Sequence, residues 1–230
     1  MAKTISAFKG FPTSGIELLA ELPARDKKWF EDWRDLYEES LLQPARELVV
    51  SLGEKLQTSV SSSITAEPSI NGSISPIFRD LRFSADKSVF KDNLMLNFWE
   101  APSKKAGPTL RLRITPKMIG FATGSVFDTQ PRLDKWRSAL DNDISGNSLQ
   151  SSINQLANNQ LIDISEPELK KPPRPYTNEH PRADLLRRKS FQVRWQEKTP
   201  DSIHTANFVD WCDERFAKLK DLHTWLKNNL

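Results

Sequence analysis

The fold class of this chain follows from residues Leu94–Thr123, which read LMLNFWEAPSKKAGPTLRLRITPKMIGFAT. Three segments within them alternate apolar and polar residues or run apolar over four to six positions: Leu94–Trp99, Leu110–Ile114 and Met118–Thr123. Short segments with that pattern are typical of β-strands, and the connections that contain SKKAGP and PK are typical of hairpins. We therefore predict that these residues form neighbouring strands of an antiparallel sheet.

Two more segments extend the predicted sheet to about five strands. Ile74–Phe78 precedes the quoted residues, Phe191–Trp195 lies far beyond them, and both have a strand-like pattern. Residues 58–72 are rich in Ser and contain a Pro and a Gly, so we expect an exposed loop there. Lys170–Tyr176 (KKPPRPY) should be extended and lie outside the sheet centre, because proline fixes φ and removes a hydrogen-bond donor.

Helical periodicity is present on both sides of the predicted strands. Asp26 can cap a long helix whose apolar face consists of Trp29, Phe30, Trp33, Leu36, Tyr37 and Leu41. Pro44 should kink this helix or restart it. The last helix is expected from Thr205 to about Asn228, with Cys212 on its apolar face. Shorter helices are expected from near Thr13, from Thr129 through Leu140, from a cap at Asn147, and from Pro181 to Arg188.

Together these elements predict an α+β protein. Its antiparallel sheet of about five strands should pack against several helices, including long N-terminal and C-terminal helices. A chain of 230 residues is long enough to bury a core without disulfides or metals. No internal repeat or convincing linker divides it, so we predict a single domain over residues 1–230.

The composition excludes several classes of protein. The 33 basic and 30 acidic residues nearly cancel to a net charge of +3, whereas nucleic-acid binders usually show a stronger imbalance. No segment approaches the roughly 20 apolar residues that span a bilayer. The single cysteine, Cys212, precludes an internal disulfide and indicates a reducing compartment. We expect a soluble, cytoplasmic protein with no membrane contact, for which nucleic acid is not the favoured partner.

Ionic residues are densest in Phe78–Lys91, FRDLRFSADKSVFK. Its cations and hydrogen-bond acceptors lie close together along the chain: Arg79, Asp80, Arg82, Ser84, Asp86, Lys87 and Lys91. Long cations beside aromatic residues are typical of a wall that binds a carboxylate or phosphate. The same pattern is typical of an ion-pair cluster that fixes a loop, and the sequence leaves both interpretations open.

A second basic segment is Lys171–Lys189. Its Pro-rich part presents three more candidate site residues: Arg174, Tyr176 and His180. This segment is a candidate for a second wall of the same site. The alternative is the start of a helix, because Pro181 suits a first turn and Asp184 suits the N-terminal dipole. Within it, Arg182–Lys189 is expected to be the solvated face of a helix or, less often, a basic stripe for nucleic acid.

These motifs together resemble the DUF2461 family, a domain of unknown function, from about Phe8 to about Phe191. The family pattern reads approximately R-D-x-R-F-S-x-D-K-x-P-Y-K, and it is matched by Arg79, Asp80, Arg82, Phe83, Ser84, Asp86, Lys87 and Lys91. Val89 and Phe90 depart from it, and Ala122-Thr123-Gly124 keeps only one glycine of a glycine-rich strand end. The resemblance implies a fold and a site but no reaction. If the glycine-rich turn approaches a ligand, the site is narrowed or altered in this chain.

Familiar catalytic and metal-binding signatures are absent from the sequence. His180, His204 and His223 lie far apart, and no two have the spacing of metal ligands, so we expect no metal site and no cofactor. Cys212 is expected to be a core residue rather than a nucleophile. Glycine-rich phosphate loops and nucleophile elbows are also missing.

The leading functional hypothesis is a binding module for an anionic ligand or a protein partner. The residues expected to hold that anion are Arg79, Arg82, Lys87 and Arg174. One alternative is an enzyme in which Asp80 or Asp86 is a general acid or base. The neighbouring cations should depress the pKa of either carboxyl, which weakens a base. Another alternative is a subunit of a nucleic-acid-linked assembly that uses Arg182–Lys189.

Overall fold

The computed structural model of the chain describes all residues except 1–4, 83–85, 101, 103, 105–106 and 160–161. Its centre is an antiparallel sheet with the strand order β1-β2-β3-β4-β6-β5. The strands are β1 (Ile64–Thr65), β2 (Leu94–Glu100), β3 (Thr109–Ile114), β4 (Met118–Val126), β5 (Asp163–Ile164) and β6 (Ser190–Lys198). The predicted α+β class is confirmed, and the described sheet has six strands rather than about five.

The three strands predicted from the quoted residues are present as β2, β3 and β4, and the one predicted at Phe191–Trp195 is part of β6. The strand predicted at Ile74–Phe78 was wrong. Ile74 makes isolated bridges to Ile70 and Leu96, and Phe78 makes one to Phe90. Pro76 interrupts the backbone donors between them. The two-residue strands β1 and β5 were not predicted, because two residues show no period.

The helices occur along the chain in the order that the sequence suggested. They are α1 (Thr13–Glu21), α2 (Lys27–Asp32), α3 (Arg34–Tyr37), the π-helical turn η2 (Glu38–Leu42), α4 (Gln43–Ser59), α5 (Gln130–Asp141), α6 (Asp143–Asn159), α7 (Ala183–Leu186), α8 (Phe208–Ala217) and α9 (Lys220–Asn229). Short 3-10 turns are η1 (Leu22–Ala24) and η3 (Asp201–His204). None of the described helices is long and apolar enough to cross a membrane.

The long helix predicted from Asp26 is divided into shorter ones. Asp26 caps α2 as predicted, with its carboxylate accepting a hydrogen bond from the Trp29 N–H at 2.8 Å. The chain leaves helical geometry at Trp33 and passes through η2 before α4 restarts with Pro44 in its first turn. A Cβ built on Gly15 of α1 would lie 2.0 Å from the carbonyl oxygen of Ser40, so η2 coincides with the close packing of α1.

Two further predictions about helices were wrong. Trp33, expected in the core, is 42% exposed and stacks on Trp29 with a ring separation of 5.1 Å. The last helix is two helices, because α8 packs against α4 while α9 packs against α6 and β4. The buried position predicted for Cys212 is confirmed.

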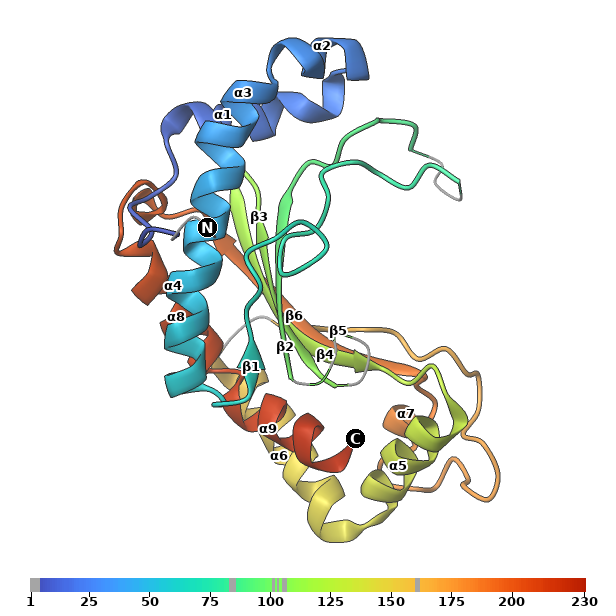
Figure 1. Cartoon of the computed structure of the whole chain (residues 1–230). Helices are drawn as coiled ribbons and strands as arrows, with labels where there is room; N and C mark the ends of the chain where they lie inside the picture. Colours follow the sequence, from blue (N-terminus) through green and yellow to red (C-terminus); the bar gives the residue numbers. More distant parts are fainter. Residues whose placement is uncertain (1–4, 83–85, 101, 103, 105–106, 160–161) are drawn as a thin grey trace.

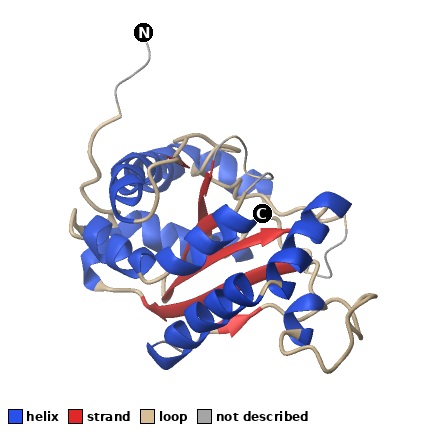
Figure 2. Cartoon of the chain, turned by 90° about the horizontal axis from the view of Figure 1, so that it is seen from below, coloured by secondary structure: helices blue, strands red, loops and turns tan. Residues whose placement is uncertain are grey.

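One face of the sheet packs against helices and the other does not. In Figure 1, α4, α8 and α9 lie on one side of the sheet, and the loops before β2 and after β5 lie on the other. The loop after β5 also projects from the body when the chain is seen from below in Figure 2. Strand alternation agrees with this: Leu110, Leu112 and Ile114 of β3 are buried, whereas Arg111 and Arg113 point to the other side. We call this second side the open face.

Candidate functional site

The described residues of the predicted segment, 78–82 and 86–91, lie outside the strands just before β2, and four of their charged side chains pair with one another. Arg79 contacts Asp86 at 3.0 Å, and Arg82 contacts Asp80 at 2.6 Å. The hydrogen bond from Arg82 lowers the pKa of Asp80, and the hydrogen bond from the Ser88 N–H lowers that of Asp86. Both carboxylates therefore stay ionised and are weak bases. Ser84 lies outside the described residues.

The remaining contacts of this segment fix it to the protein. The Lys91 ammonium donates to the carbonyl of Pro76 at 2.6 Å, and its pKa is lowered by burial and by Arg79. Phe78 and Phe90 pack on Phe30, with ring separations of 5.8 and 5.2 Å. Lys87 is exposed. We call Phe78–Lys91 the ionic loop.

In the second predicted segment, the candidate residues form a turn before α7. Nδ1 of His180 accepts a hydrogen bond from the Arg182 N–H at 3.0 Å, and its Nε2 lies 3.4 Å from Asp141. Tyr176 packs edge-on against His180, and Arg174 is exposed. Tyr176 and His180 are thus joined to each other and, through Asp141, to α5.

The expectation that Arg182–Lys189 is a solvated helix face was wrong at two of its arginines. Arg182 and Arg188 are each 5% exposed. Arg182 donates to the carbonyl of Leu140 at 2.5 Å and pairs with Asp143 at 3.0 Å, so it joins α5, α6 and α7. Arg188 pairs with Asp184 at 2.7 Å. Buried arginines with these partners do not present a basic stripe.

The two predicted segments do not form two walls of one site. The ionic loop enters the sheet at Leu94, which lies in register with Ile114 and, through it, with Ile119 of β4. The second segment enters at Ser190, which pairs with Val126 at the other end of β4. The seven residue steps from Ile119 to Val126 span about 23 Å at 3.3 Å per residue. Figure 1 shows the two loops at opposite ends of the sheet.

Between these ends, the open face contains a trough whose floor is β4. The three middle residues of β4 on this face have no side chain larger than a methyl group: Gly120, Ala122 and Gly124. The strands on either side are in register with them. One row is Arg111, Ala122 and Arg194, and the next is Arg113, Gly120 and Gln196. Long side chains from β3 and β6 therefore flank a bare central strand, which is the geometry of a groove.

Two cavities occupy this trough. The larger, about 570 Å³, lies over Gly120 and Ala122 between Arg111 and Arg194, with Met95 and Ile162 at its sides. The smaller, about 260 Å³, continues toward Gly124. Arg111 lines both cavities, so its side chain stands at their junction. We call the two cavities together the sheet trough.

Arg111 differs from the other arginines of the trough in its charge balance. Arg113 pairs with Asp92 at 2.8 Å, and Nε of Arg194 donates to Asp163 at 2.6 Å. Nε of Arg111 donates only to the Thr109 hydroxyl at 3.1 Å, and no carboxylate of the described residues forms an ion pair with it. Burial lowers its pKa. A desolvated guanidinium without a counter-charge attracts an anion.

Glycine occupies the two floor positions, 124 and 120, for different structural reasons. A Cβ on Gly124 would lie 2.3 Å from the Phe191 carbonyl oxygen, so strand packing alone requires glycine there. A Cβ on Gly120 would meet nothing nearer than the Cβ of Arg113 at 3.4 Å. Packing therefore leaves room for a side chain at Gly120, and its absence keeps the larger cavity open.

Sequence reasoning noticed the small residues Ala122 and Gly124 but missed the arginine beside them. The signal was the alternation in Thr109–Ile114 (TLRLRI), which places Arg111 and Arg113 on the face away from the leucines. The flanking residues of β6 were not predictable from local pattern, because β6 follows β4 by more than sixty residues.

A second polar cluster lies in the core, beneath the sheet. Nδ1 of His223 lies 2.9 Å from the Thr123 hydroxyl, and its Nε2 lies 3.2 Å from Glu100. Ser63 donates to Glu100 at 2.5 Å. Burial raises the pKa of Glu100, but hydrogen bonds from His223, Ser63 and Ser61 outweigh it and lower the pKa to about 2. The order hydroxyl, imidazole, carboxylate is that of an acyl-transfer triad. Thr123 and His223 are fully buried, so a substrate cannot reach them.

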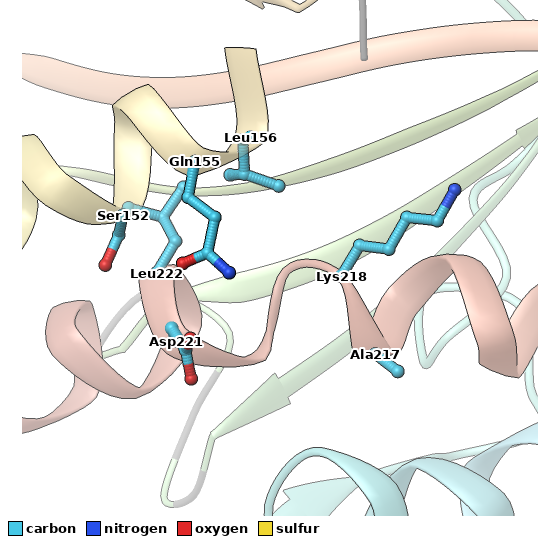
Figure 3. A pocket seen from close by; sticks show the side chains of 7 residues that line it. All are labelled: Ser152, Gln155, Leu156, Ala217, Lys218, Asp221 and Leu222. Atoms are coloured by element: carbon cyan, nitrogen blue, oxygen red, sulfur yellow. The ribbon is translucent and has the colours of Figure 1, made fainter. Parts of the chain in front are cut away.

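A third cavity, of about 380 Å³, lies where α6 crosses the junction of α8 and α9 (Figure 3). Its charged lining residues are Lys218 and Asp221, whose side chains point away from each other in Figure 3. It lacks the convergent polar groups of a binding site. Among the described residues, no three His, Cys, Asp or Glu side chains gather as metal ligands.

Comparison with protein families gives one match. The family described as conserved hypothetical protein (DUF2461) matches residues 16–225, which is most of the chain. No curated protein matches the chain. The description of the family includes no reaction and no ligand.

Proposed function

The chain belongs to the DUF2461 family, as its motifs predicted, and we propose that it is a binding module that holds an anionic small molecule in the sheet trough. Arg111 is the proposed anion ligand, and the floor over Gly120 and Ala122 receives the rest of the molecule. The observation that carries this proposal is a half-buried guanidinium, unpaired with any described carboxylate, at the junction of two cavities.

The chemistry of Arg111 suits that role. Its planar guanidinium has five N–H donors, of which Nε–H is used by Thr109, and the fork matches a carboxylate or a phosphate. A partly desolvated position strengthens such a bond relative to water. Met95 and Ile162 add apolar surface beside it, so the proposed ligand has an organic part as well as a charge.

The proposal keeps the anion-binding function predicted from the sequence and moves its centre. In the ionic loop, Arg79 and Arg82 already have carboxylate partners. We therefore assign this loop a structural role, which is to fix the segment that leads into β2. Arg174 belongs to the segment that enters the sheet at Ser190, which pairs with Val126 at the end of β4 away from the ionic loop. Asp80 and Asp86 have depressed pKa values, and no observation favours them as catalytic bases.

Calorimetric titration with benzoate, phenyl sulfate and phenyl phosphate tests this proposal. We expect at least one of them to bind, and Arg111→Gln to weaken that binding by at least about tenfold, the loss of one charge-assisted hydrogen bond. Arg113→Gln is the matched control, because Arg113 lies on the same strand and face but is paired with Asp92. Equal losses in the two variants, or no binding by the native chain, would contradict the proposal.

A further inference from the structure

The smaller cavity of the sheet trough gathers cations from three separate elements. Lys104 comes from the connection between β2 and β3, Arg111 from β3, and Arg132 from the first turn of α5. Thr109 and Ser125 add hydroxyl groups to the same lining. A cavity of about 260 Å³ has room for a tetrahedral anionic group and is smaller than the roughly 300–1,000 Å³ typical of pockets that enclose a drug-sized ligand.

The lining of this cavity has an excess of positive charge. Among the described residues that line it, Asp128 is the single carboxylate, and it lies 3.3 Å from Arg132. Lys104 is held by neutral groups, since it donates to the carbonyls of Asn71 and Gly72 and lies 4.7 Å above the ring of Trp99. Three cations against one carboxylate leave two positive charges.

Hydrogen bonds to neutral groups hold each cation in position, and they leave the excess positive charge unchanged. Arg132 donates to the Ser125 hydroxyl at 2.7 Å, and Arg111 donates to the Thr109 hydroxyl at 3.1 Å. Burial lowers the pKa of Lys104, against a smaller rise caused by Glu67, which does not line the cavity. Side chains held in place before a ligand arrives lose less entropy when they bind it.

Because a dianion balances two positive charges and a monoanion leaves one uncompensated, we infer that the ligand of the sheet trough is an organic phosphate, bound with its phosphate group in the smaller cavity. Its organic part extends over Ala122 and Gly120 in the larger cavity, beside Met95 and Ile162. This inference rests on the proposed function, because it uses the same Arg111 and the same trough.

Phenyl phosphate and phenyl sulfate are the probes that test the inference. They have the same ring and a tetrahedral anionic group, but at pH 8 the phosphate is a dianion, since its second pKa is about 6. The sulfate has a single charge. We expect the native chain to bind phenyl phosphate at least about tenfold more tightly than phenyl sulfate.

The variants Lys104→Gln and Arg132→Gln should each weaken binding of phenyl phosphate by a larger factor than binding of phenyl sulfate, and so reduce the preference for phosphate. Lys104 is half-buried and outside the sheet, so its variant tests the inference even if Arg132→Gln disturbs the start of α5. The thermal unfolding midpoint of each variant shows whether it is folded. Arg111→Gln should weaken binding of both probes.

Equal affinity for the two probes would overturn the phosphate inference and leave the proposed function standing. A preference for phosphate that survives in both Lys104→Gln and Arg132→Gln would also overturn it, because the smaller cavity would then not be its origin. If benzoate is the single probe that binds, the phosphate inference fails and the proposed function stands. If none of the three probes binds, or if Arg111→Gln changes nothing, the proposed function itself fails.

Discussion

At the scale of single residues, the properties of the sheet trough depend on positions that are ordinary in composition. Arg111 is one of many arginines, and Gly120 is one of eight glycines. What distinguishes them is register, which places Arg111 beside Ala122 and Gly120 beside Arg113. The alternation in β3 predicts which face Arg111 occupies. Its charge balance depends on Asp92 and Asp163 pairing with other arginines, and that is visible only in three dimensions.

Gly120 provides a direct test of the trough. Gly120→Val should place three carbon atoms on the floor of the larger cavity and weaken binding of phenyl phosphate, while the strand tolerates the change because Val favours β-structure. Gly120→Ala is the matched control, since its Cβ has room and leaves most of the cavity empty. Calorimetry and thermal unfolding of both variants check this. Full binding by a folded Gly120→Val protein would place the ligand elsewhere.

Glu100 should make the stability of the chain depend on pH. Its carboxyl is 3% exposed, and its pKa is depressed from 4.5 to about 2 in the folded state. The stabilisation from its ionised form is therefore complete above about pH 4.5 and is lost as the pH falls through about 2. The depression corresponds to roughly 3 kcal/mol at neutral pH.

Glu100→Gln should consequently lower the free energy of unfolding by an amount of that order at pH 7. The difference from the native chain should shrink between about pH 4.5 and pH 2, because the protonated carboxyl resembles the amide. Urea unfolding at pH 7, 4 and 3 measures it. A difference that stays constant over this range would show that Glu100 acts through packing and not through its charge.

At the scale of elements, the periodicity of apolar residues predicted β2, β3 and β4, and the Asp26 cap predicted the start of α2. Both signals are local in sequence. The breaks in the helices were not predictable in the same way. The π-helical turn η2 coincides with the approach of Gly15, more than twenty residues away in sequence. The division between α8 and α9 follows from packing against different partners, with neither Pro nor Gly at Lys218 and Leu219.

The ionic loop should owe its attachment to its aromatic residues rather than to its charges. Phe90 is fully buried and packs on Phe30, whereas the Arg82 side chain is 78% exposed. Phe90→Ala should lower the free energy of unfolding by about 3–5 kcal/mol. Arg82→Ala should change it by less than about 0.5 kcal/mol and leave affinity for phenyl phosphate unchanged. Loss of anion binding in a folded Arg82→Ala protein would restore the ionic loop as the site.

At the scale of the whole molecule, the α+β class was predictable because strand-like and helix-like periods alternate along the chain. Which face of the sheet the helices leave open was not predictable, since it depends on how α4, α8 and α9 pack (Figure 1). The sequence directed attention to the densest charges, in Phe78–Lys91. Burial and ion pairing instead single out Arg111, near the middle of the sheet. Fewer charged residues lie there along the chain, but the charge of Arg111 is not paired with any described carboxylate.

The central claim is that the anion binds at Arg111 on the open face and not at the ionic loop. The most direct measurement is a phenyl phosphate titration followed by the side-chain Nε–Hε NMR signals of the arginines, with Arg111→Gln and Arg82→Ala used for assignment. We expect the Nε–Hε signal of Arg111 and the backbone amide signals of Gly120 and Ala122 to shift with one saturation curve. The signals of Arg79 and Arg82 should not shift. Saturable shifts at Arg79 and Arg82 with Arg111 unmoved would contradict the account.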